Sequence, residues 1–201
     1  MRLTNTFSDL TIIILAGGKS TRMGRDKGFL NVGVDSFVKR ILNVSQQLTS
    51  NIFISVNKTN QSNYQSLGVP LVVDEEPENG PIGGIVSSIK RLKTNWFLVL
   101  AVDSPLVTAI SLNNLWMSKE GYEGVLYRSG HTIHPLVALY HKQTIPRWKN
   151  ALSQGKLKIT TLVETFHLLR IEVSGSNENA IQNINTPEEY SEVIKHVSNG
   201  N

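Results

Sequence analysis

The sequence contains no cysteine among its 201 residues. This absence excludes disulfide frameworks, thiolate zinc sites and a cysteine nucleophile together. Charged residues are also scarce, at 18%, and 20 basic against 16 acidic side chains give a net charge of only +4. Proteins that bind nucleic acid through extended basic surfaces usually carry more positive charge, so nucleic-acid binding is disfavoured. A pI near 9.3 still suits small anionic ligands.

Long apolar runs are missing as well. No run approaches the 18 residues of a membrane span, and residues 1–10 lack the apolar segment of a secretory signal. We therefore expect a cytoplasmic protein without membrane association. No internal repeat, low-complexity stretch or proline-rich linker divides the chain. The composition predicts one domain over residues 1–201.

Apolar periodicity predicts an α/β fold. Continuous apolar runs at 11–16, 52–56, 71–73 and 96–102 are typical of buried parallel strands, and the stripes at 37–48 and 82–92 are typical of helices that cross between them. Asp35 or Ser36 can cap the first helix. The second half is less regular, and there we expect mixed-sheet strands and further helices. The expected strands are 124–127, 136–140 and 168–173, and the expected helices are 146–153, 160–166 and 186–197.

A glycine-rich segment follows the first strand. Residues 15–28 read LAGGKSTRMGRDKG, with four glycines among lysines and arginines. Backbone N–H groups of such a loop can bind phosphate oxygens while the cations neutralise their charge. The segment is not a P-loop, because Ile13 stands where that motif needs its first glycine, and adjacent Gly17 and Gly18 exclude the dinucleotide fingerprint. A plain turn with solvated charges remains the alternative.

The segment resembles the signature of the nucleoside-diphosphosugar-transferase-like nucleotidyltransferases. Within them, LAGGKSTRMG followed by DKG is similar to the molybdenum cofactor guanylyltransferases, which join the GMP part of GTP to molybdopterin. Further matches span residues 11–197: Asn57, Asp74, Gly80, Pro81, Gly83, Gly84, Asp103-Ser104-Pro105, and Asn183 through Glu189. The resemblance implies a Rossmann-like three-layer α/β/α fold with a mostly parallel sheet, divided at about residue 110 into a nucleotide-binding half and an acceptor half over about 111–197.

The resemblance also implies roles for individual residues. Asp103 would hold Mg²⁺ against the triphosphate, and Lys27 and Arg22 would neutralise charge at the α-phosphate and the departing pyrophosphate. The implied nucleotide-binding residues are Leu15, Ala16, Gly17, Gly18, Lys27, Asn57, Asp74, Gly80, Gly84 and Asp103. The charged residues have simpler alternatives: Asp103 can cap a helix, Asp74 can be an ordinary turn residue, and the cations can be solvated.

The second substrate, the pterin, is assigned to the second half. Its implied ligands are His134, Asn183, Asn185 and Lys158. The next residues, Thr186 through Glu189, read more simply as a capping box that opens the last helix. His131 can line the same pocket or be an ordinary loop residue. His141, His167 and His196 show no metal-ligand spacing.

Two positions depart from the family pattern. Leu157 and Lys158 stand where relatives often carry two arginines, which weakens the case for a pterin-phosphate contact there. Gly33-Val34-Asp35 replaces a usual Gly-Lys-Pro, so an acid stands where a cation is common.

The implied reaction needs no general base, because the attacking phosphate oxygen of molybdopterin is already ionised. In agreement, the sequence shows no Ser/His/Asp set. Three alternatives stay open: a cytidylyltransferase acting on molybdopterin or another small phosphate, a catalytically silent nucleotide-binding adaptor and, least favoured, a nucleic-acid binder. Transient contacts with proteins that deliver or accept the cofactor are further expectations.

Overall fold

A computed structural model of the 201-residue chain describes residues 7–18 and 26–199. The strands of the main sheet are β1 (Leu10–Leu15), β4 (Ile52–Asn57), β5 (Leu71–Asp74), β6 (Trp96–Ala101), β7 (Gly124–Ser129), β8 (Thr132–His141) and β9 (Leu168–Glu172). The helices are α1 (Phe37–Ser45), α2 (Gln61–Tyr64), α3 (Gly80–Ile89), α4 (Ala109–Met117), α5 (Ile145–Ser153), α6 (Ile159–Val163), α7 (Ser176–Asn179) and α8 (Pro187–Asn199). A short hairpin, β2 (Asn31–Val32) and β3 (Asp35–Ser36), precedes α1.

The seven strands form one sheet in the order β5-β4-β1-β6-β8-β7-β9. β5, β4, β1 and β6 are parallel neighbours. β8 runs antiparallel to both β6 and β7, and β9 returns parallel to β7. The predicted mostly parallel sheet with a mixed second half is therefore confirmed, and the one reversed strand is β8.

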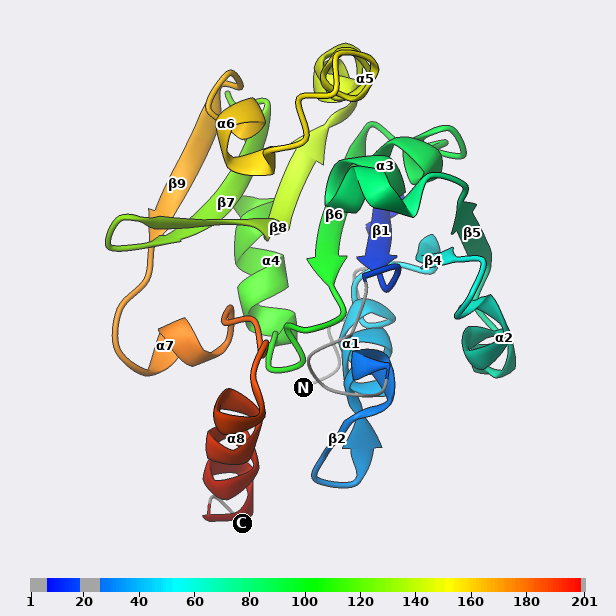
Figure 1. Ribbon diagram of the computed structural model, residues 1–201. Coiled ribbons are helices and arrows are strands. Elements are labelled where there is room, and N and C mark those ends of the chain that lie inside the picture. The colour runs from blue at the N-terminus through cyan, green and yellow to red at the C-terminus, as the bar shows by residue number, and fades with distance from the viewer. Residues whose placement is uncertain (1–6, 19–25, 200–201) are drawn as a thin grey trace.

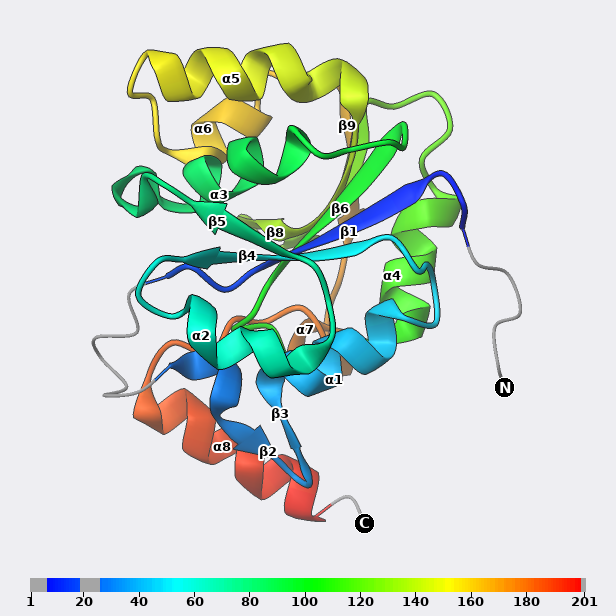
Figure 2. The same cartoon turned by 90° about the vertical axis from the view of Figure 1, so that its right-hand side faces the viewer.

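Two layers of helices cover the sheet, as Figure 2 shows with the sheet seen between them. Alternate residues of β1 serve the two layers: Ile12 and Ile14 belong to the core beneath α1, α2 and α4, whereas Ile13 belongs to the core beneath α3, α5 and α6. All three side chains are fully buried. Burial on both faces explains the unbroken apolar run of this strand.

The last helix packs outside these layers. α8 lies beside the β2–β3 hairpin (Figure 2), and Tyr190 packs with Phe37 and Ile184 in a third, small core. Its predicted capping box is confirmed: the Glu189 N–H donates to Thr186 Oγ1 (3.2 Å), and the Thr186 N–H donates to Glu189 Oε2 (3.0 Å).

Several details differ from the sequence predictions. Ser36 is the residue before α1, but neither it nor Asp35 caps the helix through its side chain. α4 was not expected, and its start is marked by Thr108, whose hydroxyl accepts from the Ser111 N–H (3.1 Å). β8 begins at Thr132 rather than at 136, so the His134-Pro135 pair lies inside a strand.

Among the described residues, no helix is long and apolar enough to cross a membrane.

Candidate active site

Four parallel strands end at one edge of the sheet, and their polar residues meet there. Asn57 and Asp74 end β4 and β5 and are partners in register, while Gly17 and Asp103 lie two residues beyond β1 and β6. Ligands of open α/β sheets bind at this edge, outside the carboxyl ends of the strands. The loops that follow the strands (Figure 1) enclose a cavity of about 180 Å³.

The cavity collects most of the expected nucleotide-binding residues. Its lining includes Leu15, Ala16, Gly17, Gly18, Lys27, Asp74, Gly80, Gly84 and Asp103. Asn57 is not among the lining residues, but its Nδ2 donates to the Gly17 carbonyl (2.8 Å) and so supports the backbone at the start of the glycine-rich loop. Arg22 lies outside the residues that the structure describes.

Lys27 and Asp103 form the charged centre of this cavity. The Lys27 Nζ lies 3.6 Å from Asp103 Oδ2, and their side chains are 15% and 19% exposed. Lys27 also donates to Asn185 Oδ1 at 2.7 Å, across 158 residues of sequence. Lys27 therefore has partners on both halves of the chain, which disfavours the alternative that it is a solvated loop cation.

One oxygen of the Asp103 carboxylate has no partner among the described residues. Oδ1 is buried and accepts no hydrogen bond from the described residues. Burial raises the pKa of Asp103 above its usual value, and Lys27 opposes that shift. Buried polar atoms are normally satisfied, so an unpartnered carboxylate oxygen in a cleft calls for a ligand that binds anionic oxygen.

Asp103 is not a helix cap. The nearest following helix, α4, begins six residues later and is capped by Thr108. The backbone around Asp103 is held from the second half of the chain: the Ile184 N–H donates to the Asp103 carbonyl (2.7 Å), and Ser104 Oγ donates to Asn183 Oδ1 (2.7 Å). The turn is thus fixed by long-range contacts, which leaves the carboxylate available.

Asp74 and two glycines form the opposite wall. Asp74 is 4% exposed, and Oδ1 accepts from the Glu76 N–H (3.2 Å). Burial raises the pKa of Asp74, whereas this hydrogen bond lowers it. Gly84 lies so close to β4 that an added Cβ would stand 2.9 Å from Ser55 Oγ, and Gly80 has a φ of +60°, which favours glycine.

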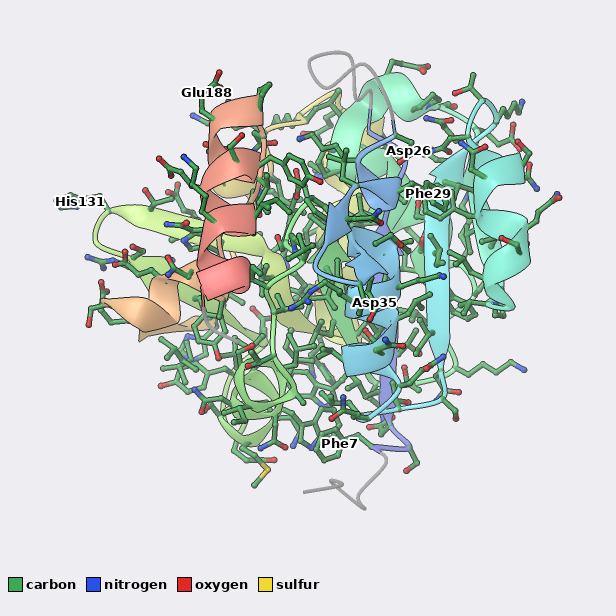
Figure 3. All side chains as sticks on the ribbon, turned by 90° about the horizontal axis from the view of Figure 1, so that it is seen from below. Phe7, Asp26, Phe29, Asp35, His131 and Glu188 are labelled. Atoms are coloured by element: carbon green, nitrogen blue, oxygen red, sulfur yellow. The ribbon has the colours of Figure 1, made fainter. Side chains whose placement is uncertain are left out.

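A second cavity, of about 300 Å³, adjoins the first, and Leu136 lines both. His134 and Asn183 line this second cavity together. His134 Nε2 is buried without a hydrogen-bond partner among the described residues, and burial lowers the pKa of the imidazole. The neighbouring His131 is exposed and points away from the body of the protein (Figure 3).

Lys158 lies apart from the other expected pterin ligands. It is exposed and lines a third cavity, of about 660 Å³, between α5 and α6, together with Leu157 and Arg147. Its chain neighbour Ile159 lines the second cavity, so the two cavities flank the start of α6. The structure thus joins Asn183 and Asn185 to Ser104 and Lys27 by hydrogen bonds and sets His134 in the adjoining cavity, whereas Lys158 lines neither of the first two cavities.

Sequence reasoning missed residues that line or support the site. Ser55 lines the first cavity and Gln182 the second, while Ser104 was noticed only as part of a turn. Ser55 carried a faint signal, because it is a hydroxyl in the middle of an otherwise apolar strand. Gln182 carried none, since nothing in its spacing distinguishes it from other loop amides.

The chain is an α/β protein of the nucleotidyltransferase class, and its cleft lies at the ends of the parallel strands. The sequence profile of the MobA-like NTP transferase domain matches residues 12–167, and the chain belongs to this family. A molybdenum cofactor guanylyltransferase from Serratia proteamaculans is 32% identical over 183 residues, 90% of this chain and 92% of the relative. One from Vibrio cholerae is 30% identical over 92% of this chain and 91% of the relative.

A solved structure agrees on the fold. The molybdopterin-guanine dinucleotide biosynthesis protein A of Archaeoglobus fulgidus superposes with a TM-score of 0.80, at 20% identity, over 94% of this chain and 99% of its own. The expected three-layer α/β/α architecture is therefore confirmed.

Proposed function

We propose that this protein transfers GMP from GTP to the terminal phosphate of molybdopterin and releases pyrophosphate. The names of its relatives support this assignment, because each is a molybdenum cofactor guanylyltransferase. In the reaction, a phosphate oxygen of molybdopterin forms a bond to the α-phosphorus. The bond from that phosphorus to the bridging oxygen breaks, and pyrophosphate leaves with the electron pair.

The observation that carries the proposal is the position of Lys27 and Asp103 beside the border between two cavities. One cavity lies along the glycine-rich strand ends, the other beside His134, and Leu136 lines both. Asn185 binds Lys27, and Asn183 binds the residue after Asp103. A nucleotide in the first cavity and an acceptor in the second would meet at these charges.

Lys27 has a direct task in this reaction. Negative charge accumulates on the α-phosphate and the departing pyrophosphate, and a preorganised cation in a partly buried site stabilises it. Asn185 holds the Lys27 ammonium in place before any substrate binds. No residue needs to remove a proton, because the attacking phosphate oxygen is already ionised.

A divalent metal ion fits the same place. Nucleotidyltransferases of this family generally use one, and we propose Mg²⁺. The part of the chain that the structure describes holds no cluster of three or more metal-binding side chains. Mg²⁺ commonly takes one or two protein carboxylates and fills its shell with phosphate oxygens and water, so the unpartnered Asp103 Oδ1 suffices as a protein ligand. When bound, the ion would neutralise triphosphate charge.

Asp74 favours guanine as the base. Its buried carboxylate lines the nucleotide cavity and can accept from the adjacent N–H groups on the guanine edge. Cytosine has a single amino donor and would satisfy this carboxylate less completely. The glycine loop and Asp103, by contrast, are suited to either nucleotide.

The test is a product assay with purified protein, molybdopterin, and MgGTP or MgCTP, read by mass spectrometry. We expect the guanine dinucleotide of molybdopterin and pyrophosphate. Preference for CTP would establish the cytidylyltransferase alternative. Tight GTP binding without product would identify a silent adaptor. The Asp103→Asn variant is the control, because contaminating activity would not respond to it.

A cytoplasmic location and transient contacts with proteins that deliver or accept the cofactor remain predictions.

A further inference from the structure

We propose that Asn60 and Tyr64 are positioning residues that aim Lys27 into the cleft. They would do so through Asp26, the residue before Lys27. The inference rests on the proposed function, because it assigns Lys27 its task at the transferred phosphate. Neither residue lines the cavity, so each would act through the turn that carries Lys27.

Tyr64, the last residue of α2, contacts this turn through its hydroxyl. It is fully buried, and its hydroxyl donates to Asp26 Oδ1 at 2.7 Å. The same oxygen accepts the Gly28 N–H (3.0 Å), so Asp26 caps the single 3-10 turn η2 (Lys27–Phe29). Burial and the adjacent carboxylate raise the pKa of Tyr64, which keeps the phenol protonated and donating.

Asn60 joins the two described ends of the glycine-rich segment. Its Nδ2 donates to the Ala16 carbonyl (2.7 Å) and to Asp26 Oδ2 (3.2 Å), while its Oδ1 accepts the Asn57 N–H (3.0 Å). Asn60 stands at the cap position of α2 yet makes no capping hydrogen bond. The side chain most suited to capping this helix is instead committed to the loop.

The fit around Tyr64 is also close at the two residues that follow Lys27. A Cβ on Gly28 would lie 2.2 Å from the Tyr64 hydroxyl oxygen, so only glycine permits this approach. The Phe29 ring packs on the Tyr64 ring with centroids 4.9 Å apart. Figure 3 labels Asp26 and Phe29 on this turn, which lies against the α2 region.

These contacts fix the backbone of the turn, whereas partners that include Asn185 and Asp103 hold the end of the Lys27 side chain. A catalytic cation loses effect when its position shifts by about 1 Å, because the charge no longer meets the developing charge on the phosphate. Loosening Asp26 would therefore lower kcat through Lys27. If Asn60 and Tyr64 had only a structural role, their loss would lower thermal stability, and its effect on kcat would not depend on Lys27.

The first experiment compares two buried tyrosine hydroxyls. Tyr64→Phe removes the hydrogen bond to Asp26, and Tyr127→Phe removes an equally short bond to the Ser111 carbonyl (2.7 Å) on α4 instead of to the turn that carries Lys27. We expect Tyr64→Phe to lower kcat about tenfold with the KM for GTP within about twofold, and Tyr127→Phe to leave kcat within about twofold. A kcat for Tyr64→Phe equal to that of Tyr127→Phe overturns the proposal.

A double-mutant cycle then asks whether Tyr64 acts through Lys27. In a Lys27→Ala background, Tyr64→Phe should lower kcat by less than about twofold more. A full tenfold loss in that background means that Tyr64 acts by another route, and the proposal fails. Asn60→Ala should behave in the same way, with a loss of about tenfold that also disappears without Lys27.

A crystal structure separates this proposal from the proposed function. In the Asn60→Ala/Tyr64→Phe variant, we expect the Lys27 Nζ to leave hydrogen-bond distance of Asn185 Oδ1, which is 2.7 Å in the unaltered chain. An unmoved Lys27 contradicts the positioning role. This readout holds whether or not the unaltered protein makes the dinucleotide, while absence of product from that protein contradicts only the proposed function.

Discussion

The two cavities that meet at Leu136 are built in different ways. The first lies at the ends of four parallel strands, and its central charged groups, Lys27 and Asp103, are partly buried. Long-range hydrogen bonds hold the Lys27 ammonium and the Asp103 backbone. The second lies beside the antiparallel strand β8, and its polar groups include an exposed amide, Asn183, and a half-buried histidine, His134.

The difference matches the tasks that we assign to them. Stabilising charge during phosphoryl chemistry requires groups fixed before the reaction begins, because reorganisation would cost part of the gain. Recognising an acceptor requires a few donors and acceptors in a largely preformed pocket. We therefore expect changes in the first cavity to lower kcat and changes in the second to raise the KM of the acceptor.

The largest effect is expected for Asp103→Asn. The amide keeps the shape but offers a metal ion a neutral oxygen, so kcat should fall about a thousandfold. Steady-state kinetics across a Mg²⁺ and Mn²⁺ titration measures the loss. The control is Asp35→Asn, an acid in the β2–β3 hairpin (Figure 3), which should keep kcat within about twofold. A normal metal dependence for Asp103→Asn would contradict the ligand role.

The same substitution should not destabilise the protein. Burial raises the folded-state pKa of Asp103 above its ordinary value of 3.8, so the ionised carboxylate is less favourable in the fold than in the unfolded chain. This contribution to stability is present at low pH and is lost as the pH rises through the folded-state pKa. In urea unfolding from pH 3 to 7, the free energy of unfolding of Asp103→Asn should increase relative to that of the unaltered chain as the pH rises. An opposite trend would mean that Lys27 outweighs burial.

Next in size is Lys27→Ala, with an expected loss in kcat of about a hundredfold, because a preorganised charge at the reacting phosphate disappears. The matched control is Lys39→Ala, an exposed lysine on α1. Single-turnover rates with both substrates saturating measure the effect. Equal rates for the two variants would return Lys27 to the alternative of a solvated cation.

In the second cavity, His134→Ala should raise the KM of the acceptor about tenfold and leave the KM of GTP nearly unchanged. The reason is the loss of one buried hydrogen-bonding group aimed at a ligand. His131→Ala is the control, since this exposed histidine lines neither cavity. Initial-rate measurements with each substrate varied in turn give the two KM values. A change confined to the KM of GTP would reverse the assignment of the two cavities.

The smallest effect is expected where the third cavity begins. If an acceptor phosphate reaches α6, Leu157→Arg should lower the KM of the acceptor about threefold and Lys158→Ala should raise it by a similar factor, because exposed charges contribute little. Leu157→Ala separates the added charge from the lost apolar side chain. If neither charge change alters the KM, acceptor binding lies with His134 and Asn183.

Much of the first half could be predicted because its signals are local. The run of four aliphatic residues in β1 requires burial on both faces, and the abrupt change to Gly17 and Gly18 marks the strand end where ligands bind. α4 escaped prediction because Ile110 and Met117 are exposed, which blurs the apolar stripe of that helix. The start of β8 escaped because a proline argues against a strand.

The structure explains that proline. Pairing between β7 and β8 shifts at Leu126 and Tyr127, so that Tyr127 faces His134 while Leu126 faces Ala138. Pro135 lies within the irregular stretch between these two pairs, where it need not donate a ladder hydrogen bond to β7. His134 lies next to this irregularity and lines the second cavity. No spacing in the sequence predicts the shift in strand pairing.

The sequence by itself determined the strand-and-loop character of the first half, the glycine-rich segment and the identity of the charged residues, because these follow from neighbours a few positions apart. Only the tertiary structure decided that Lys27 meets Asn185 and that Ser104 meets Asn183. The physical reason is that both contacts depend on the strand order around β6 and on the packing of α8 against the β2–β3 hairpin. Such long-range packing brings together residues whose separation along the chain carries no information about their distance.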